Sequence, residues 1–571
     1  MSTNIGSVPP KPPSFEKRLP LALGLMMLVL LASQYFFKPA PGPKPVSPVN
    51  KEQAAKVTDK PSPATVAASP AAVNETGASR LGASAETETA IDTALYHVTF
   101  TNRGGVVKSW VLKKYRDDAG KPLELINSAA TDVPRPFAIE LKDQKLPIDP
   151  NTVLYRSKPT NDNLGVEFDF AEGNTVIHKS FSFGRDSYLA EVRSQVLVNN
   201  TPTPHFLLWR GGFGDQKATN AAQSQHTVRY DSGAGKLVTK TAKDAKDGPV
   251  TDSGNYTFAG LEDTFFAAVA LPNGSSSLEV RTFKDAVKLP KEDKSVDFVG
   301  GGVSTGAQND LSLFVGPKDI DILQKVNPKL GQIVDWGFFG ILAHPLFTSL
   351  NWVHDHWTGN FGWAIILVTL IINLALFPLR LTSLKSARKM QKLQPQIQAI
   401  NAKYKNISLR DPKKAEQNQE VMELYKREGV NPVGGCIPML IQLPFFYAFY
   451  RVLNIAIELR HAPWLWVPDL SSAETLPIHL LPIILIATQF LTQRMTPAAG
   501  VDPNQQKMMM LMPLFFGFMF YHASAGLVLY WLTGNLVGIA QQLLINRLMP
   551  APAAPPAAPS SKAPMKKITK K

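Results

Sequence analysis

The stretch from Phe361 to Leu379, FGWAIILVTLIINLALFPL, is apolar over about 20 residues, the length that crosses a bilayer as one helix. One side of that helix is polar, because Thr369 and Asn373 lie four residues apart and Arg380 follows about two turns later near the same face. Exposing such a stripe to lipid would cost several kcal/mol, so we expect it to face protein or a water-filled cavity. A polar contact between helices and a hydrated functional cavity both remain open.

Apolar runs recur along the chain and predict six membrane-spanning helices, at 19–37, 361–379, 433–457, 476–495, 508–523 and 526–545. The first run follows Lys17 and Arg18 and lacks a small-residue cleavage site, so we favour an uncleaved anchor over a signal peptide. The later runs contain polar side chains that are expected to contact one another or water, because lipid would leave them unpaired. These side chains are Gln442, Arg451, Asn454, Gln489 and Asn535.

The formal net charge of +14 is concentrated beside these runs, at 1–18, 380–432 and 546–571. Residues 380–432 hold 12 basic and 5 acidic side chains, and residues 546–571 hold 6 basic side chains and no acid. Basic residues that flank membrane spans mark the cytosolic side, and six spans return the C-terminus to the side of the N-terminus. The charge therefore predicts an orientation with both termini in the cytosol, not a sequence-specific nucleic-acid partner.

Changes in composition and periodicity divide the rest of the chain. Residues 38–90 are rich in Pro, Ala and Ser, which indicates a disordered tether. Beyond them apolar and polar residues alternate, as at Val166, Phe168 and Phe170, which predicts strands. We predict a multi-domain membrane protein with an α-helical core and an all-β sandwich. Its parts are a cytosolic N-terminus (1–18), the first span (19–37), the tether (38–90), the β-sandwich (91–317), an interfacial helical segment (318–357), the helical core (358–549) and a basic tail (550–571).

The charged segment at 380–432 predicts a cytosolic helical hairpin. Apolar residues recur at three- and four-residue steps from Leu381 to Tyr404, and Arg410-Asp411-Pro412 interrupts the pattern before a second helical run. Something must cover this narrow apolar stripe: a partner helix, lipid headgroups or another protein. The basic residues on the hairpin include Lys385, Arg388, Lys392, Lys413 and Lys414.

Catalytic signatures are missing from the sequence. No phosphate-binding loop, nucleophile elbow or HExxH motif occurs, and the single cysteine, Cys436, excludes an intrachain disulfide. Glu262 and Asp263 are adjacent in a predicted strand, so they point to opposite faces and are expected to be solvated. His354 and His356 lack a third metal ligand. We predict no catalytic residue, no metal and no cofactor.

Six motifs between about 340 and 548 resemble, in order and at similar spacing, the bacterial YidC insertases of the YidC/Oxa/Alb family. The N-terminal half is similar in architecture to the Gram-negative type, which has an additional span and a large periplasmic domain. The motifs are FPL, KMQKLQPQIQAI, LYKREGVNPVGGCIPMLIQLPFFYAFY, ELRHAP, DPNQQKMMMLMP and SAGLVLYWLTGNL.

The resemblance implies an inner-membrane insertase and chaperone whose hydrophilic groove opens to cytosol and lipid. Its implied clients are nascent inner-membrane proteins, received alone or with the Sec translocon and without ATP. The 91–317 domain would be periplasmic, the hairpin would recruit clients, and the basic tail would contact the ribosome. A channel or secondary transporter is the alternative, although no inverted repeat relates the spans. The groove residues expected are Thr369, Asn373, Arg380, Gln442, Arg451 and Trp531.

At one position this chain departs from the family pattern. Members commonly carry an arginine five residues before the proline of the motif that is FPL here, and that position is Asn373. Two other arginines are available as a groove charge. We expect Arg451 to be the deeper charge and Arg380 the charge at the entrance.

Overall fold

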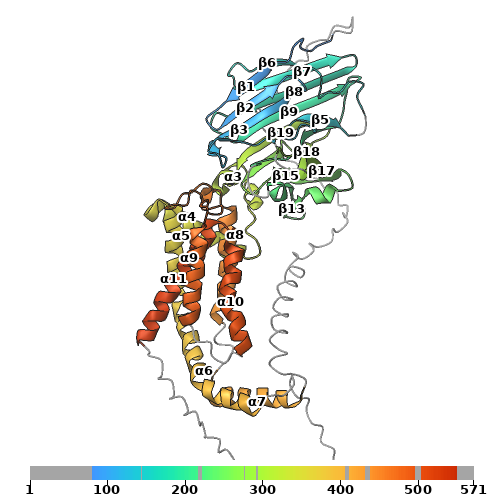
Figure 1. Cartoon of the computed structure of the whole chain (residues 1–571). Coiled ribbons are helices and arrows are strands. Elements are labelled where there is room, and N and C mark those ends of the chain that lie inside the picture. Colours follow the sequence, from blue (N-terminus) through green and yellow to red (C-terminus); the bar gives the residue numbers. More distant parts are fainter. Residues whose placement is uncertain are drawn as a thin grey trace, which may run out of the picture. The chain divides into compact units, whose positions relative to one another are not determined.

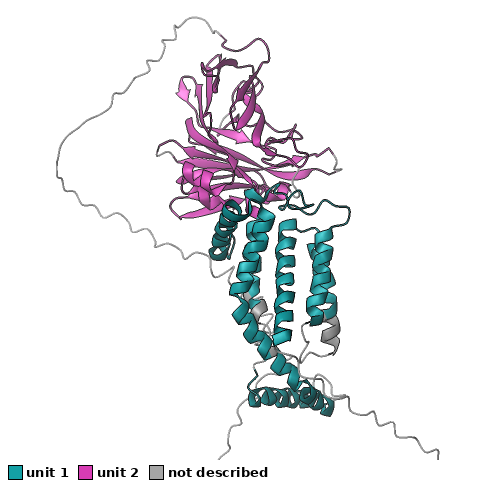
Figure 2. Ribbon diagram, turned by 90° about the vertical axis from the view of Figure 1, so that its left-hand side faces the viewer, with its two compact units in different colours: residues 1–39, 336–454, 458–571 teal, residues 40–335, 455–457 magenta. Residues whose placement is uncertain are grey.

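The computed structural model describes residues 80–142, 145–216, 221–274, 277–290, 294–404, 411–430, 437–495 and 503–548. The predicted N-terminus, first span and basic tail, and the tether up to residue 79, lie outside these residues. The described chain forms a β-sheet unit, which runs to Asp335 and also includes Ile455–Ile457, and a helical unit, which contains the other residues from Trp336 on. The two units are drawn in magenta and teal in Figure 2. The predicted interfacial segment at 318–357 thus contributes residues to both units.

The β-sheet unit consists of three antiparallel sheets and confirms that this half of the chain is mostly β (Figure 1). The first sheet has the order β1 (Glu88–Asp92), β2 (Tyr96–Thr101), β3 (Val106–Arg116) and β4 (Pro122–Glu124). The large sheet has the order β13 (Lys236–Lys240), β12 (His226–Asp231), β15 (Tyr256–Glu262), β16 (Phe266–Pro272), β19 (Gln308–Pro317), β9 (Leu189–Val198), β8 (Thr175–Phe183), β7 (Gly165–Glu172) and β6 (Arg156–Pro159), with β10 (Thr201–Pro202) on β9. The third has the order β14 (Val250–Gly254), β17 (Leu278–Val287), β18 (Val296–Ser304), β11 (His205–Trp209) and β5 (Ala138–Leu141). Short helices complete the unit: α2 (Ala221–Ser224), η1 (Ala242–Ala245), α3 (Ile320–Val326) and η2 (Leu330–Ile333).

Alternating burial along the strands builds the core of this unit. Val166, Phe168 and Phe170 on β7 are all buried, as their period-two spacing predicts. On β18, glycines leave room for large side chains of the large sheet and of the adjacent strand β11. A Cβ on Gly301 would lie 3.0 Å from Leu261, and a Cβ on Gly302 would lie 2.9 Å from Leu208. The run Gly300–Gly302 therefore serves packing.

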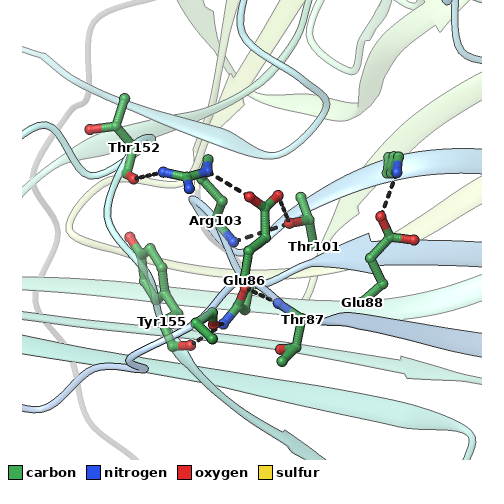
Figure 3. Close-up of polar contacts among 10 residues, drawn as sticks. Glu86, Thr87, Glu88, Thr101, Arg103, Thr152 and Tyr155 are labelled. Atoms are coloured by element: carbon green, nitrogen blue, oxygen red, sulfur yellow. Dashed lines mark hydrogen bonds and ion pairs between the residues drawn. The ribbon is translucent and has the colours of Figure 1, made fainter.

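The predicted boundary of the tether at residue 90 is wrong, because residues 80–90 are attached to the β-sheet unit. The backbones of Leu81 and Ala171 exchange hydrogen bonds of 2.8 and 2.9 Å. The Glu86 carboxylate accepts hydrogen bonds from the Arg103 guanidinium at 3.0 Å and from the Thr101 hydroxyl at 3.1 Å, as Figure 3 shows. These donors lower the pKa of Glu86. The polar composition that suggested disorder instead supplies side chains for these contacts.

The expectation that Glu262 and Asp263 are solvated is also wrong, because both are buried. The Glu262 carboxylate accepts a hydrogen bond from the Lys318 ammonium at 2.9 Å. Asp263 accepts hydrogen bonds from the backbone amides of Asp215, Phe265 and Phe266 at 2.8, 2.8 and 2.6 Å. Burial raises the pKa of Asp263 to about 6. The two acids therefore hold loops in place at the end of β15.

Lys179 on β8 is a fully buried lysine. Its ammonium donates hydrogen bonds to the carbonyl oxygens of Gly104, Gly105 and Phe137, at 2.7, 3.2 and 2.8 Å. Gly104 and Gly105 form a turn with φ values of 76° and 54°, and Phe137 also has a positive φ, of 69°. Lys179 thus ties two left-handed backbone segments to the large sheet. Burial lowers the pKa of Lys179 to about 7.

We expect the free energy of unfolding of an isolated fragment of residues 80–335 to rise with pH between about 7 and 10.5. The lower limit is the pKa of Lys179 in the folded state, and the upper limit is its pKa in the unfolded chain. In this window the unfolded chain binds one more proton than the folded chain, so the slope approaches about 1.4 kcal/mol per pH unit. Thermal melting at several pH values measures it. Lys179→Met should flatten the slope, whereas Lys158→Met, at an exposed lysine, should keep it. An unchanged slope in Lys179→Met would contradict this prediction.

The helical unit contains the five core segments predicted to span the membrane. Its elements are α4 (Gly340–Val353), η3 (His354–Thr358), α5 (Phe361–Ala375), α6 (Phe377–Lys403), α7 (Lys413–Arg427), α8 (Ile437–Ile455), η5 (Ile457–Leu459), α9 (Leu480–Met495), α10 (Pro503–Phe520) and α11 (Ala525–Leu548). The Asn360 side chain caps α5 by accepting from the amides of Gly362 and Trp363. At the start of α6, Pro378 has no amide hydrogen to continue the α5 ladder. α11 packs against both α5 and α9 (Figure 1).

Among the described residues, one helix, Ala525–Leu548, is long and apolar enough to cross a membrane. A second candidate is the pair Gly340–Thr358 and Phe361–Ala375, which bends by 115° at its break. Leu480–Met495 and Met510–Phe520 are apolar but shorter. The helical nature of this half is confirmed, while the number of six spans stays a prediction.

Candidate functional site

The polar stripe predicted on α5 lies inside the helical unit. Thr369 is fully buried, and Asn373 is 9% exposed. The Thr369 hydroxyl donates to the carbonyl of Ile365 at 2.6 Å, and the Asn373 amide donates to the carbonyl of Thr369 at 2.8 Å. Each donor therefore has a partner one turn earlier in the same helix. The Asn373 backbone carbonyl lies near the C-terminal end of α5. It accepts a hydrogen bond from a side chain of α11.

Arg380, Asn373 and Gln541 form a cluster that joins α5, α6 and α11, which we call the Gln541 cluster. The Arg380 guanidinium donates through Nη1 to the Gln541 Oε1 at 2.9 Å. The Gln541 Nε2 donates to the backbone carbonyl of Asn373 at 3.2 Å. Gln541 is 6% exposed, and Arg380 is half-buried. One side-chain amide thus links the Arg380 cation of α6 to α11.

Gln442, Tyr530 and Trp531 form a second polar and aromatic group, the Tyr530 cluster, where α8 meets α11. The Gln442 Nε2 donates to the Tyr530 hydroxyl at 3.0 Å. The Tyr530 ring stacks on Phe449, with centroids 4.3 Å apart. The Trp531 ring contacts Phe446 on α8 and Phe516 and Phe520 on α10. Gln541 follows Tyr530 by 11 residues, so the two clusters lie about 16 Å apart along α11.

Arg451 lies with residues that precede α4. A Cβ on Gly337 would lie 3.3 Å from the Arg451 Nε and 3.1 Å from the Tyr447 hydroxyl. Of the six predicted groove residues, the structure therefore brings Asn373 and Arg380 together in one cluster and Gln442 and Trp531 in another. Thr369 adjoins the first cluster through the hydrogen bond from Asn373.

The apolar stripe of the hairpin is covered by its own second helix. Met390, Leu393, Ile397 and Ile400 of α6 pack with Leu424 and Tyr425 of α7 in one buried group. A Lys403–Glu420 ion pair of 2.7 Å joins the two helices. The apolar stripe of α6 is thus covered by a partner helix of the same chain. Both helices leave their charged faces toward solvent.

The five basic hairpin residues differ in their surroundings. Lys385, Lys392 and Lys413 are exposed, and Lys414 is partly exposed. The Arg388 guanidinium instead donates through Nη2 to the Asn546 Oδ1 at 2.5 Å. Arg388 therefore ties α6 to the C-terminal end of α11.

The described residues contain no group of three or more His, Cys, Asp and Glu side chains that could hold a metal ion. The His354 imidazole contacts the Asp355 carboxylate at 2.8 Å and stacks on Phe361, while His356 stacks on Trp352. These contacts suit aromatic packing around η3, which contains both histidines.

Sequence reasoning missed Gln541 and Tyr530, the α11 partners of the predicted residues. Gln541 lies 161 residues from Arg380, and Tyr530 lies 88 residues from Gln442. The one available signal was the pair Gln541-Gln542 inside an apolar run, since amides in a span need partners.

Comparison with known proteins gives consistent results along the chain. The family described as YidC periplasmic domain matches residues 88–349, and the family described as 60Kd inner membrane protein matches residues 352–552. The "Membrane protein insertase YidC" of Geotalea daltonii is 34% identical over 552 residues, covering 94% of this chain and 100% of the relative. That of Citrifermentans bemidjiense is 34% identical over 562 residues, covering 93% of this chain and 99% of the relative. A crystal structure titled as an active YidC insertase is 20% identical, with 81% of this chain and 94% of that chain covered and a TM-score of 0.35.

Proposed function

This chain belongs to the YidC family of membrane protein insertases, and we propose that it inserts and helps fold proteins of the bacterial inner membrane. The observation that carries the mechanism is the pair of polar clusters on α11, one of them cationic. A hydrophilic path between them lets the polar segment of a client leave water in stages. This lowers the desolvation barrier that a bare bilayer imposes on polar groups.

The chemistry of insertion needs no covalent step. The cation of the Gln541 cluster attracts acidic residues of the translocated segment, because opposite charges interact more strongly beside protein than in bulk water. The Tyr530 cluster then offers aromatic and amide surface to the segment farther along α11. The apolar helix of the client partitions into lipid by itself, and this supplies the driving force. No nucleotide and no cofactor take part.

The orientation follows from charge. The chain has six spans. Its basic segments flank these spans, so both termini lie in the cytosol and the β-sheet unit lies in the periplasm. The hairpin of α6 and α7 lies in the cytosol and recruits clients through Lys385, Lys392, Lys413 and Lys414. Partners include the Sec translocon and the ribosome. The basic tail binds the ribosome because its lysines attract the phosphates of ribosomal RNA.

Purified protein in liposomes tests this function. With no nucleotide present, it should protect a short single-span client from external protease, whereas protein-free liposomes should not. A flux of small solutes without client insertion would instead favour a channel or secondary transporter.

Removing most of residues 91–310 should leave insertion largely intact. The residues of both clusters lie in the helical unit, and the β-sheet unit has a core of its own. Insertion rates of full-length and shortened protein at equal density in liposomes measure the effect. A loss as large as that caused by removing the hairpin would contradict this separation.

A further inference from the structure

We propose that Gly538 and Gln541 position the Arg380 guanidinium, and that this placement sets the preference of the protein for clients with acidic translocated segments. The inference rests on the proposed function and adds two positioning residues on α11. Neither residue carries charge. Each acts through Arg380.

Gly538 provides the space that the guanidinium occupies. A Cβ at this position would lie 2.7 Å from the Arg380 Nη2 and 3.0 Å from Nη1. Contacts this short do not persist in folded proteins, so any larger residue at 538 would displace the guanidinium. The atoms in conflict are the far end of a flexible side chain, so the helix itself is not strained.

Gln541 fixes the direction of the guanidinium. It follows Gly538 by three residues and therefore lies on the same face of α11. Both polar atoms of its side-chain amide form hydrogen bonds. Oε1 accepts from Arg380, and Nε2 donates to the Asn373 carbonyl. That carbonyl is among the last four of α5, which lack a full set of partners within their own helix. The Gln541 oxygen that accepts the hydrogen bond from Arg380 is neutral. The guanidinium therefore keeps its whole charge for a client carboxylate.

Gly538→Ala and Gly534→Ala form a matched pair of variants. Both substitute alanine on α11 and gain similar helix propensity. A Cβ at Gly534 would meet no atom within 4 Å, whereas a Cβ at Gly538 meets Arg380. The readout is the ratio of insertion rates for two single-span clients in liposomes, one with an acidic and one with a neutral translocated tail.

We expect Gly538→Ala to lower this ratio, by less than the loss of about tenfold expected for Arg380→Ala, because the charge is displaced but not removed, and Gly534→Ala to leave the ratio unchanged. In an Arg380→Ala background, Gly538→Ala should have no further effect, because its target is gone. Gln541→Glu should also lower the ratio, since a carboxylate at this position neutralises the guanidinium while keeping the helices joined.

Equal ratios for Gly538→Ala and Gly534→Ala would overturn the inference. So would a loss from Gly538→Ala that persists when Arg380 is already alanine, or a normal ratio in Gln541→Glu. Insertion of the neutral-tailed client by unmodified protein reports on the proposed function separately. If neither client is inserted by unmodified protein, the proposed function fails and the inference fails with it.

Discussion

Removing residues 384–428 and joining the ends with a short Gly-Ser linker should abolish client insertion while the helical core and the β-sheet unit stay folded. The removed segment contains the contact between α6 and α7 and the lysines proposed to recruit clients. The cluster residues lie outside it, so the loss would be one of recruitment. Liposome insertion assays measure the activity, and protease resistance of the remaining chain reports its folding.

A matched variant tests whether charge or shape carries recruitment. Replacing Lys385, Lys392, Lys413 and Lys414 by Gln keeps the apolar contact between the helices. We expect insertion to fall and to become less sensitive to salt, since exposed charges act through screened attraction. Normal insertion by the deletion variant would contradict the role of the hairpin altogether.

Arg380→Ala should reduce insertion of acidic-tailed clients about tenfold and affect neutral-tailed clients much less. The guanidinium is the cation of the Gln541 cluster, so its loss leaves that cluster without charge. Arg451→Ala provides the comparison, because it removes the same type of side chain beside Gly337, and we expect a smaller effect there. Initial insertion rates for the two client types give the measurement.

If both single variants and the double variant insert acidic-tailed clients normally, fixed charge is dispensable. The path would then work through hydration alone. The neutral polar groups of Thr369, Asn373 and Gln442 would supply its polarity.

Sequence reasoning predicts best those features whose residue pattern lies within a single helix or strand. The spacing of Thr369 and Asn373 predicts a face of α5 that is turned toward protein or a water-filled cavity, and both residues are buried. The hairpin followed from its apolar periodicity and its Pro-containing break. Period-two alternation predicted the strands of the β-sheet unit, as at Val166 and Phe168.

Contacts between distant segments could not be predicted in this way. The pairing of Arg380 with Gln541 depends on how α6 lies against α11, and no local periodicity encodes that. The predicted tether is too long because residues 80–90 are polar, and their polar side chains contact strands that come later in the chain. Burial of Glu262 likewise depends on Lys318, which approaches from 56 residues away.

The most direct test is site-specific photo-crosslinking of a stalled nascent client to the helices that carry the two clusters. Crosslinkers replace Gln442 and Trp531, and the controls replace Leu374 and Leu543, exposed apolar residues of α5 and α11. We expect adducts between the translocated segment of the client and positions 442 and 531, and few adducts at 374 and 543. Equal adducts at all four positions, or none at 442 and 531, would contradict a hydrophilic path along α11.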